Sequence, residues 1–587
     1  MTDVDVSSVE ARPDSVTGID IRRLRLGCWI TLIAIAIARA WFTRYEFDGD
    51  SVSYLDMARA ISEGHPAAAV NACWSPGYPT LLSFFLWLFH PSPYWECPLV
   101  HFVNVLIFAG ALISLQLFWS ELWLWHKDYA GNQDAEIPET AFWALGYAAF
   151  AIANLNMIPV SRVGPDQLMA AFCYLAAWNV LRFRRTLRFS SALMLGLTLG
   201  LGYYAKAPLF PLGFVFISCA CLGLPRFRKT VSLGLIATVA FLLVSFPLIA
   251  ALSRGKGRLT FGDAARLNYA FFVDGVQHFQ HWQGGPSGSG LPVHPTRKLN
   301  SFPEIYEFAE TNMGSYPPWF DPTYWYEGVT PHFNWTLQWK VFVANLFLIF
   351  QIIVDSATAL ICAVIILVLL AGYRKQLSKA FQHFWFIWTP GAIGLLMFAL
   401  VHVVVRYLGG CLILLFAGVV CGCSLPTSDK TRRAVGCIGL AALVTAGTGL
   451  ISQASQEAFG SNHAAGRSPR NALIADFLLE NGLHPDAKVA VIGYGTEAYW
   501  AHLARLQVVA EIPAHITSTQ AHPALDFWES GPEKQQEALR ILEQTGADAV
   551  IAGSQLSLEG SVPPWVKPPW KKIAGTDAFV YFFHPVP

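Results

Sequence analysis

The sequence predicts a polytopic α-helical membrane protein with about 11 transmembrane helices and a C-terminal exterior α/β domain. Of its 587 residues, 54% are hydrophobic and only 14% are charged, whereas about a quarter of the residues of a soluble domain are charged. Several apolar runs reach the ~20 residues that a helix needs to cross a bilayer. After residue 455 the composition becomes that of a soluble protein, which predicts a separate domain outside the membrane.

The charge balance and the cysteines bear on nucleic-acid binding, metal binding and disulfide formation. The formal net charge is zero, so the sequence offers no electrostatic basis for binding nucleic acid. Most of the 11 cysteines lie in apolar runs, where they act as small hydrophobic residues. Cys421 and Cys423 have no matching ligand pair nearby, so they do not indicate a metal site. Cys73 and Cys97 share one exterior region, and a disulfide between them stays open.

Hydropathy predicts the membrane spans, which follow a polar tail at residues 1–20. The first apolar run continues without a small-residue cleavage site, so we interpret it as a retained helix. The run 80–89 is too short to cross and predicts a helix in the membrane interface. The predicted spans lie near 26–43, 99–120, 140–157, 166–182, 190–205, 207–224, 231–252, 343–371, 384–404, 407–425 and 434–452.

Basic residues predict the orientation. They fall in alternate connections between spans, and the positive-inside rule makes those connections cytoplasmic. The tail is then cytoplasmic, residues 21–455 form the membrane domain with exterior loops 44–98 and 253–342, and residues 456–587 lie outside. The basic clusters are Arg22/Arg23/Arg25, Lys127, Arg182/Arg184/Arg185/Arg188, Arg226/Arg228/Lys229, Arg374/Lys375/Lys379 and Lys430/Arg432/Arg433.

The C-terminal segment alternates between helix and strand patterns. Residues 471–481 predict a helix that ends at Gly482, and residues 532–544 predict a second helix. Buried strands are expected at 488–493 and 547–552, so a small α/β domain follows. The sequence Gly493-Tyr494-Gly495 lacks the third glycine of a dinucleotide fingerprint and does not indicate nucleotide binding.

An acidic stretch directly follows the first span. Asp48, Asp50 and Asp56 lie within nine residues of each other, and carboxylates near hydrocarbon are costly unless they have a function. We interpret Asp50 as a catalytic base, with helix capping by Asp50 or Ser51 as the alternative. Asp48 can share the role, and Asp56 is expected to be a solvated or paired helix residue. Tyr54 lies one helical turn from Asp50, on the same face.

Three more exterior turns carry polar residues toward the same side. Arg162 and Asp166 lie between the third and fourth spans, Lys206 between the fifth and sixth, and Arg406-Tyr407 after His402 between the ninth and tenth. Charges scattered at random would divide between the two faces of the membrane, so their gathering on one face favours a common site. Each residue also has an ordinary interpretation: Asp166 can cap a helix after Pro165, and Lys206 and Arg406 can snorkel to the interface.

Aromatic residues gather in the exterior loops. The second loop contains Tyr324 and Trp325 within the run 316–326, and the first contains Trp74 and Tyr78. Such residues usually form an aromatic belt at the interface. The alternative is a surface on which sugars stack.

These motifs, taken in order, resemble the GT-C superfamily of polyprenyl-phosphate-sugar glycosyltransferases, and within it the bacterial protein-mannosyltransferase-like and aminoarabinose-transferase-like enzymes. The resemblance covers about residues 20–425, and the C-terminal domain also looks like those appended to such proteins. The motifs are Asp50-xxx-Tyr54, Trp74-Ser75-Pro76-Gly77-Tyr78-Pro79, Gly164-Pro165-Asp166-Gln167-Leu168, Gly200–Lys206 and Arg406-Tyr407.

The resemblance implies an inverting transfer of a sugar from a polyprenyl-phosphate donor to an acceptor hydroxyl on the non-cytoplasmic face of a bacterial inner (plasma) membrane. Asp50 matches the family's base, Lys206 the cation near the lipid phosphate, and Arg406 a second phosphate or carboxylate partner; Arg162 is a further candidate for the phosphate. Two positions depart from the pattern: Ser51 replaces a common acidic residue, and Gly409-Gly410 follows where a proline is common. The substrate-binding candidates are Tyr54, Trp74, Tyr78, Asp166, Tyr324, Trp325 and Tyr407.

The expected partners are membrane lipid, the lipid-linked sugar and an acceptor that the sequence does not identify. No cofactor is indicated. Four exterior histidines have no compact ligand spacing, so we predict no metal. They are His278, His281, His294 and His332.

Two other classes of function compete with the transferase. A lipid or sugar transporter would carry substrate without chemistry, but transporters tend to have internal repeats and polar groups near mid-membrane. The sequence has no clear repeat, and its acids gather at one face. The second alternative is a catalytically inactive scaffold whose exterior domain recruits partners.

Overall fold

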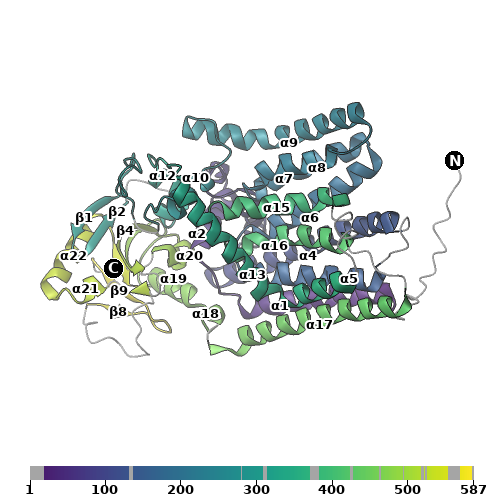
Figure 1. Cartoon of the computed structure of the whole chain (residues 1–587). Helices are drawn as coiled ribbons and strands as arrows, with labels where there is room; N and C mark the ends of the chain where they lie inside the picture. The colour runs from purple at the N-terminus through teal and green to yellow at the C-terminus, as the bar shows by residue number, and fades with distance from the viewer. Residues whose placement is uncertain are drawn as a thin grey trace.

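The computed structural model has two parts, a helical bundle and a sheet domain at one end of it (Figure 1). Three groups of residues named above lie outside the described part of the chain: the tail residues 1–18, the cluster Arg374/Lys375/Lys379, and Tyr494 with Cys423. The structure describes residues 19–130, 137–278, 281–308, 314–370, 382–422, 428–461, 464–493, 495–516, 521–522, 525–552 and 569–584.

The bundle contains a helix at each predicted span. Six of these helices, namely α1, α4, α9, α13, α16 and α17, are long and apolar enough to cross a membrane by themselves. The helices are α1 (Ile21–Phe42), α4 (Pro93–Ala130), α5 (Glu139–Ala151, continued by the π-helical turn Ile152–Met157), α6 (Asp166–Thr186), α7 (Phe189–Ala205), α8 (Leu209–Cys221), α9 (Phe227–Lys256), α13 (Trp335–Leu370), α15 (Trp385–Ala399), α16 (Val405–Gly422) and α17 (Asp429–Phe459).

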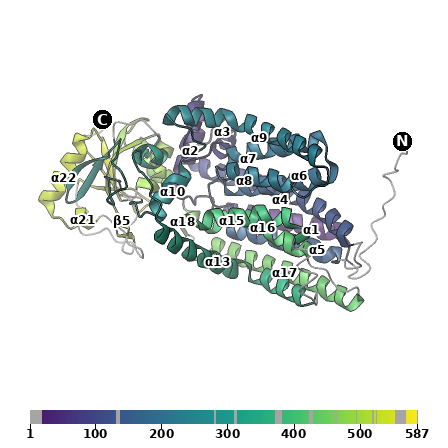
Figure 2. The same ribbon diagram turned by 45° about the horizontal axis from the view of Figure 1, so that its top comes forward.

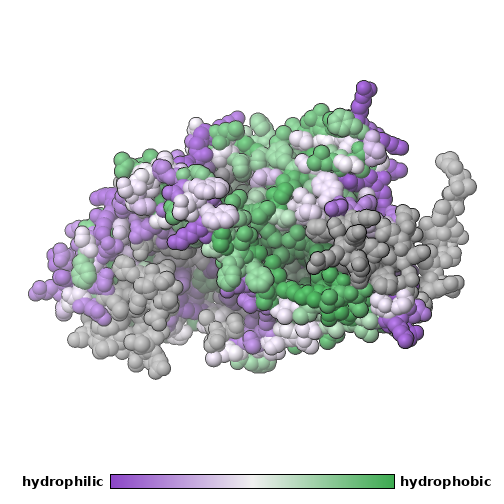
Figure 3. Space-filling model, viewed as in Figure 1, coloured by the Kyte–Doolittle hydropathy of each residue, from purple (hydrophilic) through white to green (hydrophobic). Residues whose placement is uncertain are grey.

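On the face seen in Figure 3, hydrophobic side chains cover the middle of the bundle, whereas hydrophilic residues gather on the sheet domain and at the opposite end of the bundle. Many exposed residues of α9 and α13 are large and apolar, such as Leu243, Phe246, Phe347 and Leu369. In water such a surface would be unstable, so it is the surface that contacts lipid. The chain is therefore a multi-pass membrane protein.

Small residues let the helices approach closely. A Cβ added at Gly196 of α7 would lie 2.3 Å from the carbonyl oxygen of Ala237 in α9. At Gly409 of α16 it would lie 2.8 Å from the carbonyl oxygen of Ala153. Close backbone contact of this kind drives helix association in membranes, and it explains why Gly409-Gly410 stands at the start of α16.

Short helices link the bundle helices α1 and α4. The helix α2 (Gly49–Ser62) follows the first span, then come the single turn Pro66–Ala69 and α3 (Gly77–Phe89). With 13 residues, α3 has the short apolar character that the sequence predicts for the run 80–89. Cys73 and Cys97, the candidate disulfide pair, are both free thiols.

The sheet domain is built from two distant segments of the chain. Its sheet has the strand order β1-β2-β4-β3-β7-β9-β8; β3 runs parallel to β4 and β7, and the other pairs are antiparallel. The strands are β1 (Arg297–Ser301), β2 (Glu304–Glu307), β3 (Lys488–Gly493), β4 (Gln507–Pro513), β7 (Ala549–Ala552), β8 (Lys571–Lys572) and β9 (Phe579–Phe582), beside a small pair, β5 (His515–Ile516) and β6 (Ala521–His522).

Because β2 pairs with β4, the exterior loop after α9 forms one edge of the sheet of the C-terminal domain. The helices and strands predicted for this domain are confirmed, with α19 ending before Gly482, whose φ of +94° suits glycine. Viewed from a second direction, the domain again lies at one end of the bundle (Figure 2). Its helices are α18 (Ala464–Arg467), α19 (Arg470–Glu480), α20 (Tyr499–Ala504), α21 (Leu525–Trp528) and α22 (Pro532–Gln544), and the loop adds α10 (Ala264–Phe272), α11 (Pro317–Phe320) and α12 (Pro322–Trp325).

Candidate active site

A cavity of about 860 Å³ lies where the bundle meets the sheet domain. Its wall includes the start of α2, the turns before α6, α8 and α16, the exterior loop around α10 and α11, and the loop after β3. This volume is in the range of small-molecule sites. The four turns that the sequence predicts to share one face therefore open into one cavity.

Asp48 is the residue that caps α2. Its Oδ1 accepts hydrogen bonds from the backbone N–H of Ser51 (3.1 Å) and from the Ser51 hydroxyl (2.8 Å), while Ser51 Oγ accepts the N–H of Asp48 (3.0 Å). This reciprocal pattern is a capping box. The alternative that Asp50 or Ser51 is the N-cap residue is therefore wrong: Asp48 is the N-cap, and Ser51 is its partner in the capping box. Asp50, in the first turn, is left to face the cavity.

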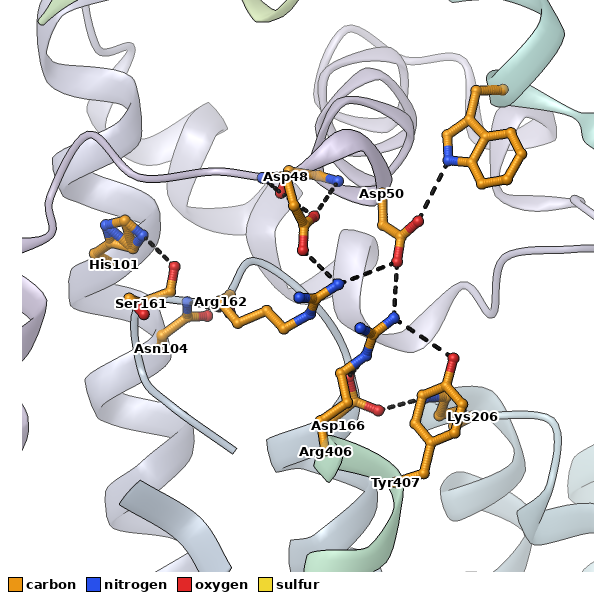
Figure 4. A network of polar contacts seen from close by, with 12 residues as sticks. Asp48, Asp50, His101, Asn104, Ser161, Arg162, Asp166, Lys206, Arg406 and Tyr407 are labelled. Atoms are coloured by element: carbon orange, nitrogen blue, oxygen red, sulfur yellow. Dashed lines mark hydrogen bonds and ion pairs between the residues drawn. The ribbon is translucent and has the colours of Figure 1, made fainter. Parts of the chain in front are cut away.

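The Asp50 carboxylate is held by three donors. Its Oδ2 accepts from Arg406 Nη2 at 2.9 Å and from Arg162 Nη2 at 3.4 Å, and its Oδ1 accepts from the Trp319 indole at 3.3 Å. These contacts are drawn in Figure 4. Hydrogen bonds from two guanidinium groups are charge-assisted and fix the orientation of the carboxylate. Asp50 is thus an oriented carboxylate that lines the cavity, which is the arrangement that a general base requires.

Arg162 connects the two acids at the start of α2. Its Nη2 lies 2.5 Å from Asp48 Oδ2. Two side chains of α4 hold the turn that carries Arg162. Asn104 Nδ2 donates to the carbonyl oxygen of Arg162 (3.0 Å), and His101 Nε2 lies 2.8 Å from the carbonyl oxygen of Ser161 (Figure 4). Burial and the nearby Asp50 charge raise the pKa of Asp48, although Arg162 opposes the shift.

Asp166 and Lys206 form the deeper part of the same network. Asp166 opens α6 without a capping hydrogen bond, so the capping alternative is wrong. Its Oδ1 pairs with Lys206 Nζ, and its Oδ2 lies 3.0 Å from Arg406 Nε. The Lys206 ammonium also lies 3.9 Å from the centre of the Tyr407 ring, a cation–π contact. Lys206 and Arg406 are therefore held inward by the acids rather than directed toward the interface.

The network is balanced in charge. Its three carboxylates, Asp48, Asp50 and Asp166, face three cations, Arg162, Lys206 and Arg406. Buried charges are tolerated when they are paired in this way. An anionic ligand would therefore compete with the carboxylates for the cations.

The aromatic candidates divide into two groups. Tyr54, Trp74 and Tyr407 line the cavity, and Trp74 donates its indole N–H to the carbonyl oxygen of Trp319 at 3.0 Å. Tyr54 and Trp74 contact each other edge to face, with ring centres 5.3 Å apart. They offer an aromatic surface against which a sugar or a lipid can pack.

Tyr78, Tyr324 and Trp325 do not line the cavity. Tyr78 is fully buried behind Tyr54 and donates to Asn104 Oδ1 at 2.8 Å. Tyr324 stacks on His294, with ring centres 3.9 Å apart, and Trp325 is also buried and donates to the carbonyl oxygen of Pro317 at 2.9 Å. These three residues support the exterior loop and the cavity wall.

The exterior histidines lie in different environments. His278 lines the cavity, where burial and nearby His402 lower its pKa to about 4, against a weaker opposing effect of Asp50. His281 Nε2 contacts Glu511 Oε1 at 2.5 Å, and the backbone N–H of His332 donates to Asp274 at 2.8 Å. Among the described residues, no three His, Cys, Asp or Glu side chains are grouped as metal ligands.

Sequence reasoning missed the part of the wall that the sheet domain supplies. Glu511 on β4 lines the cavity and accepts a hydrogen bond from the Tyr316 hydroxyl at 2.8 Å. Thr496, in the loop after β3, lies next to Gly49: a Cβ added at Gly49 would be 3.1 Å from Thr496 Cβ. The aromatic run 316–326 was a signal for Tyr316 and Trp319, but no motif marks Glu511 or Thr496.

No protein-family model matches the sequence, and no curated protein matches it. Among solved structures, ArnT from Cupriavidus metallidurans in the apo state matches with a TM-score of 0.50 and 11% identity, over 94% of this chain and 97% of that chain. The structure of that ArnT bound to undecaprenyl phosphate matches with a TM-score of 0.49 and 11% identity, over 95% and 98%. An oligosaccharyltransferase from Archaeoglobus fulgidus, tethered with an acceptor peptide, matches with a TM-score of 0.45 and 11% identity, over 90% and 69%. On this similarity, the chain shares the fold of apo ArnT.

Proposed function

We propose that the protein is an inverting glycosyltransferase that moves a sugar from a polyprenyl-phosphate donor to an acceptor hydroxyl on the non-cytoplasmic face of the membrane. The observation that carries the proposal is the Asp50 carboxylate, which lies in a cavity wall between Arg406 (2.9 Å) and Arg162 (3.4 Å). A base and two cations side by side suit a reaction in which a hydroxyl is deprotonated while a phosphate leaves.

The proposed reaction is a single displacement. The acceptor oxygen attacks the anomeric carbon and gives its proton to Asp50, while the bond from that carbon to the phosphate oxygen breaks and the phosphate leaves with the electron pair. An unassisted hydroxyl is a weak nucleophile, so the base is needed. The configuration at the anomeric carbon inverts because the acceptor enters opposite the leaving group.

Lys206, Arg406 and Arg162 would stabilise the phosphate, whose negative charge grows as the bond breaks. All three cations are paired with carboxylates, so phosphate binding requires that this pairing loosens.

We further propose that Tyr54, Trp74 and Tyr407 contact the sugar or the lipid, and that the sheet domain faces the periplasm or the exterior of a bacterial inner membrane. The domain meets the bundle at the cavity, so an acceptor could enter from the exterior side. The orientation follows from the alternating basic clusters.

Mass spectrometry tests this proposal. The purified protein in lipid nanodiscs is supplied with a panel of polyprenyl-phosphate sugars and membrane extracts as acceptor. It is compared with Asp50→Asn and with the control Asp486→Asn, an exposed aspartate that does not line the cavity. We expect wild type and the control to consume one donor and release polyprenyl phosphate, and Asp50→Asn to release far less. Bound donor without release of polyprenyl phosphate by wild type would instead favour the transporter or the scaffold.

A further inference from the structure

Four charged side chains are buried together where α2, α4 and α20 meet. His502 of α20 is 0% exposed; its Nδ1 lies 2.5 Å from Asp56 Oδ1 of α2, and its Nε2 lies 2.6 Å from Glu96 Oε1 of α4. Arg59 of α2 pairs with Glu96 Oε2 at 2.7 Å and also donates to the carbonyl oxygen of His502. None of these four residues lines the cavity, so we call them the junction cluster.

The geometry requires a protonated histidine. A neutral imidazole has one N–H donor and one acceptor, whereas both ring nitrogens of His502 face carboxylate oxygens. Burial lowers the pKa of His502, as does Arg59, but Glu96 and Asp56 outweigh them and raise it above its ordinary value. With an imidazolium and a guanidinium facing two carboxylates, the junction cluster is neutral, which is how buried charges persist.

The remaining acceptor sites of the two carboxylates are also filled. Asp56 accepts the backbone N–H (2.7 Å) and the hydroxyl (2.8 Å) of Ser315, and Glu96 accepts the Tyr499 hydroxyl at 3.3 Å. The Tyr499 ring stacks on His502, with centres 5.6 Å apart. Every group that faces His502 is thus accounted for: two acids, one guanidinium and one aromatic ring.

The junction cluster and the candidate base share one helix. Asp56 lies six residues after Asp50 in α2, a rise of about 9 Å along the helix axis, and α2 adjoins α20 in the ribbon view (Figure 1). The start of α2 also touches the sheet domain, because Gly49 packs against Thr496. The sheet domain therefore contacts α2 at its first turn and again at the junction cluster.

We infer that His502 is a positioning residue: its imidazolium fixes the sheet domain on α2 and thereby holds Asp50 against Arg162 and Arg406. Two charge-assisted hydrogen bonds from one fully buried ring join two membrane-domain helices to the exterior domain. The inference concerns the structure of α2, and it rests on the proposed function only for its effect on turnover.

The test compares His502→Gln with two other variants of the full-length protein in nanodiscs. His502→Gln leaves Asp56 and Glu96 with only Arg59, so one negative charge is uncompensated. The double variant His502→Gln with Asp56→Asn restores the charge balance. His484→Gln is the control, because His484 is exposed in the same domain.

Hydrogen–deuterium exchange of peptides from 49–62 is the readout, since it reports local opening of α2 without any need for activity. We expect His502→Gln to exchange at least about tenfold faster there, the double variant to return to within about threefold of wild type, and His484→Gln to match wild type. Wild-type exchange in His502→Gln would overturn the inference. If His502→Gln cannot be purified, the double variant decides: exchange more than about threefold faster than in wild type would overturn the inference.

Turnover then separates this inference from the proposed function. We expect kcat to fall in His502→Gln and to recover in part in the double variant, with the KM for donor little changed, because the junction cluster does not touch the cavity. If wild type turns over no donor, the proposed function fails while the exchange result stands by itself.

Discussion

Arg406 joins two carboxylates that come from different turns, and its replacement by lysine tests this role. Its Nη2 lies 2.9 Å from Asp50 and its Nε 3.0 Å from Asp166. A lysine keeps the positive charge but has a single ammonium group, which cannot reproduce this two-sided geometry. Arg406→Lys therefore removes one charge-assisted hydrogen bond and leaves the net charge of the network unchanged.

The size of the effect follows from that bond. A hydrogen bond to a charged group contributes about 1.5–3 kcal/mol, and about 1.4 kcal/mol corresponds to a tenfold change in rate. Because the Arg406 side chain is 16% exposed, solvent screening removes little of this hydrogen-bond free energy. We expect kcat/KM for the polyprenyl-phosphate sugar to fall by about ten- to a hundredfold.

The assay measures release of polyprenyl phosphate under initial-rate conditions, with thermal unfolding of the same preparations. Arg505→Lys is the matched control, because Arg505 makes an exposed ion pair with Glu63 at 3.1 Å, and such pairs contribute little. Wild-type kcat/KM in Arg406→Lys would refute the argument that the two-sided contact matters. A loss that appears equally in Arg505→Lys would refute its assignment to this site.

Three further predictions address the cavity and its wall. Gly495→Ala should lower the unfolding temperature, because the added Cβ would lie 2.1 Å from Tyr316 Cε2 and 2.5 Å from Glu511 Oε2, and such overpacking costs about 1–3 kcal/mol. Gly447→Ala is the control, because a Cβ there meets nothing within 4 Å. Equal unfolding temperatures of the two variants would contradict the prediction. Lys206→Met should raise the donor KM by about thirtyfold or more, since loss of one partner of a buried charge pair costs about 2 kcal/mol or more; an unchanged KM would argue against phosphate binding by Lys206. Burial and Asp50 raise the pKa of Asp48, so the folded state binds the Asp48 proton more tightly than the unfolded state, and stability falls as the pH rises from the ordinary pKa to the raised one. Across this window the unfolding temperature of Asp48→Asn should rise relative to that of wild type. A difference that stays constant with pH would contradict this prediction.

The sequence carried enough information for the bundle and for the charged network. Each predicted span corresponds to a helix, because ~20 apolar residues in a row have few other stable environments. Asp50, Arg162, Lys206 and Arg406 meet because the turns that carry them alternate with the opposite ends of the spans and so lie on the same face of the bundle. The order of the spans along the chain was enough to predict that these four residues lie close together.

The details of that network depended on local geometry. The spacing of Asp48 and Ser51 is that of a capping box, but Ser51 occupies the position where Glu or Gln is usual. The sequence therefore indicated Asp50 and Ser51, and not Asp48, as alternatives for the cap. Asp166 follows Pro165 as a capping residue would, yet Lys206 and Arg406 outcompete the backbone for its oxygens. Charge pairing of this kind has no signature in the sequence.

Contacts between the bundle and the sheet domain could not be predicted from the sequence. His502 and Asp56 are 446 residues apart, and neither lies in a recognisable motif. Strands β1 and β2 join the C-terminal sheet because β4 offers them an edge, which depends on tertiary structure. The contribution of the sheet domain to the cavity therefore appears only in three dimensions.

The most direct test of the central claim measures kcat and donor affinity together for Asp50→Asn. Asparagine keeps the size of the side chain but cannot accept a proton at neutral pH, and loss of a general base lowers rates by about 10²–10⁴-fold. We predict that polyprenyl phosphate release at saturating donor falls into this range, while the donor dissociation constant changes only a few fold. Release at the wild-type rate would contradict the assignment of Asp50 as the base.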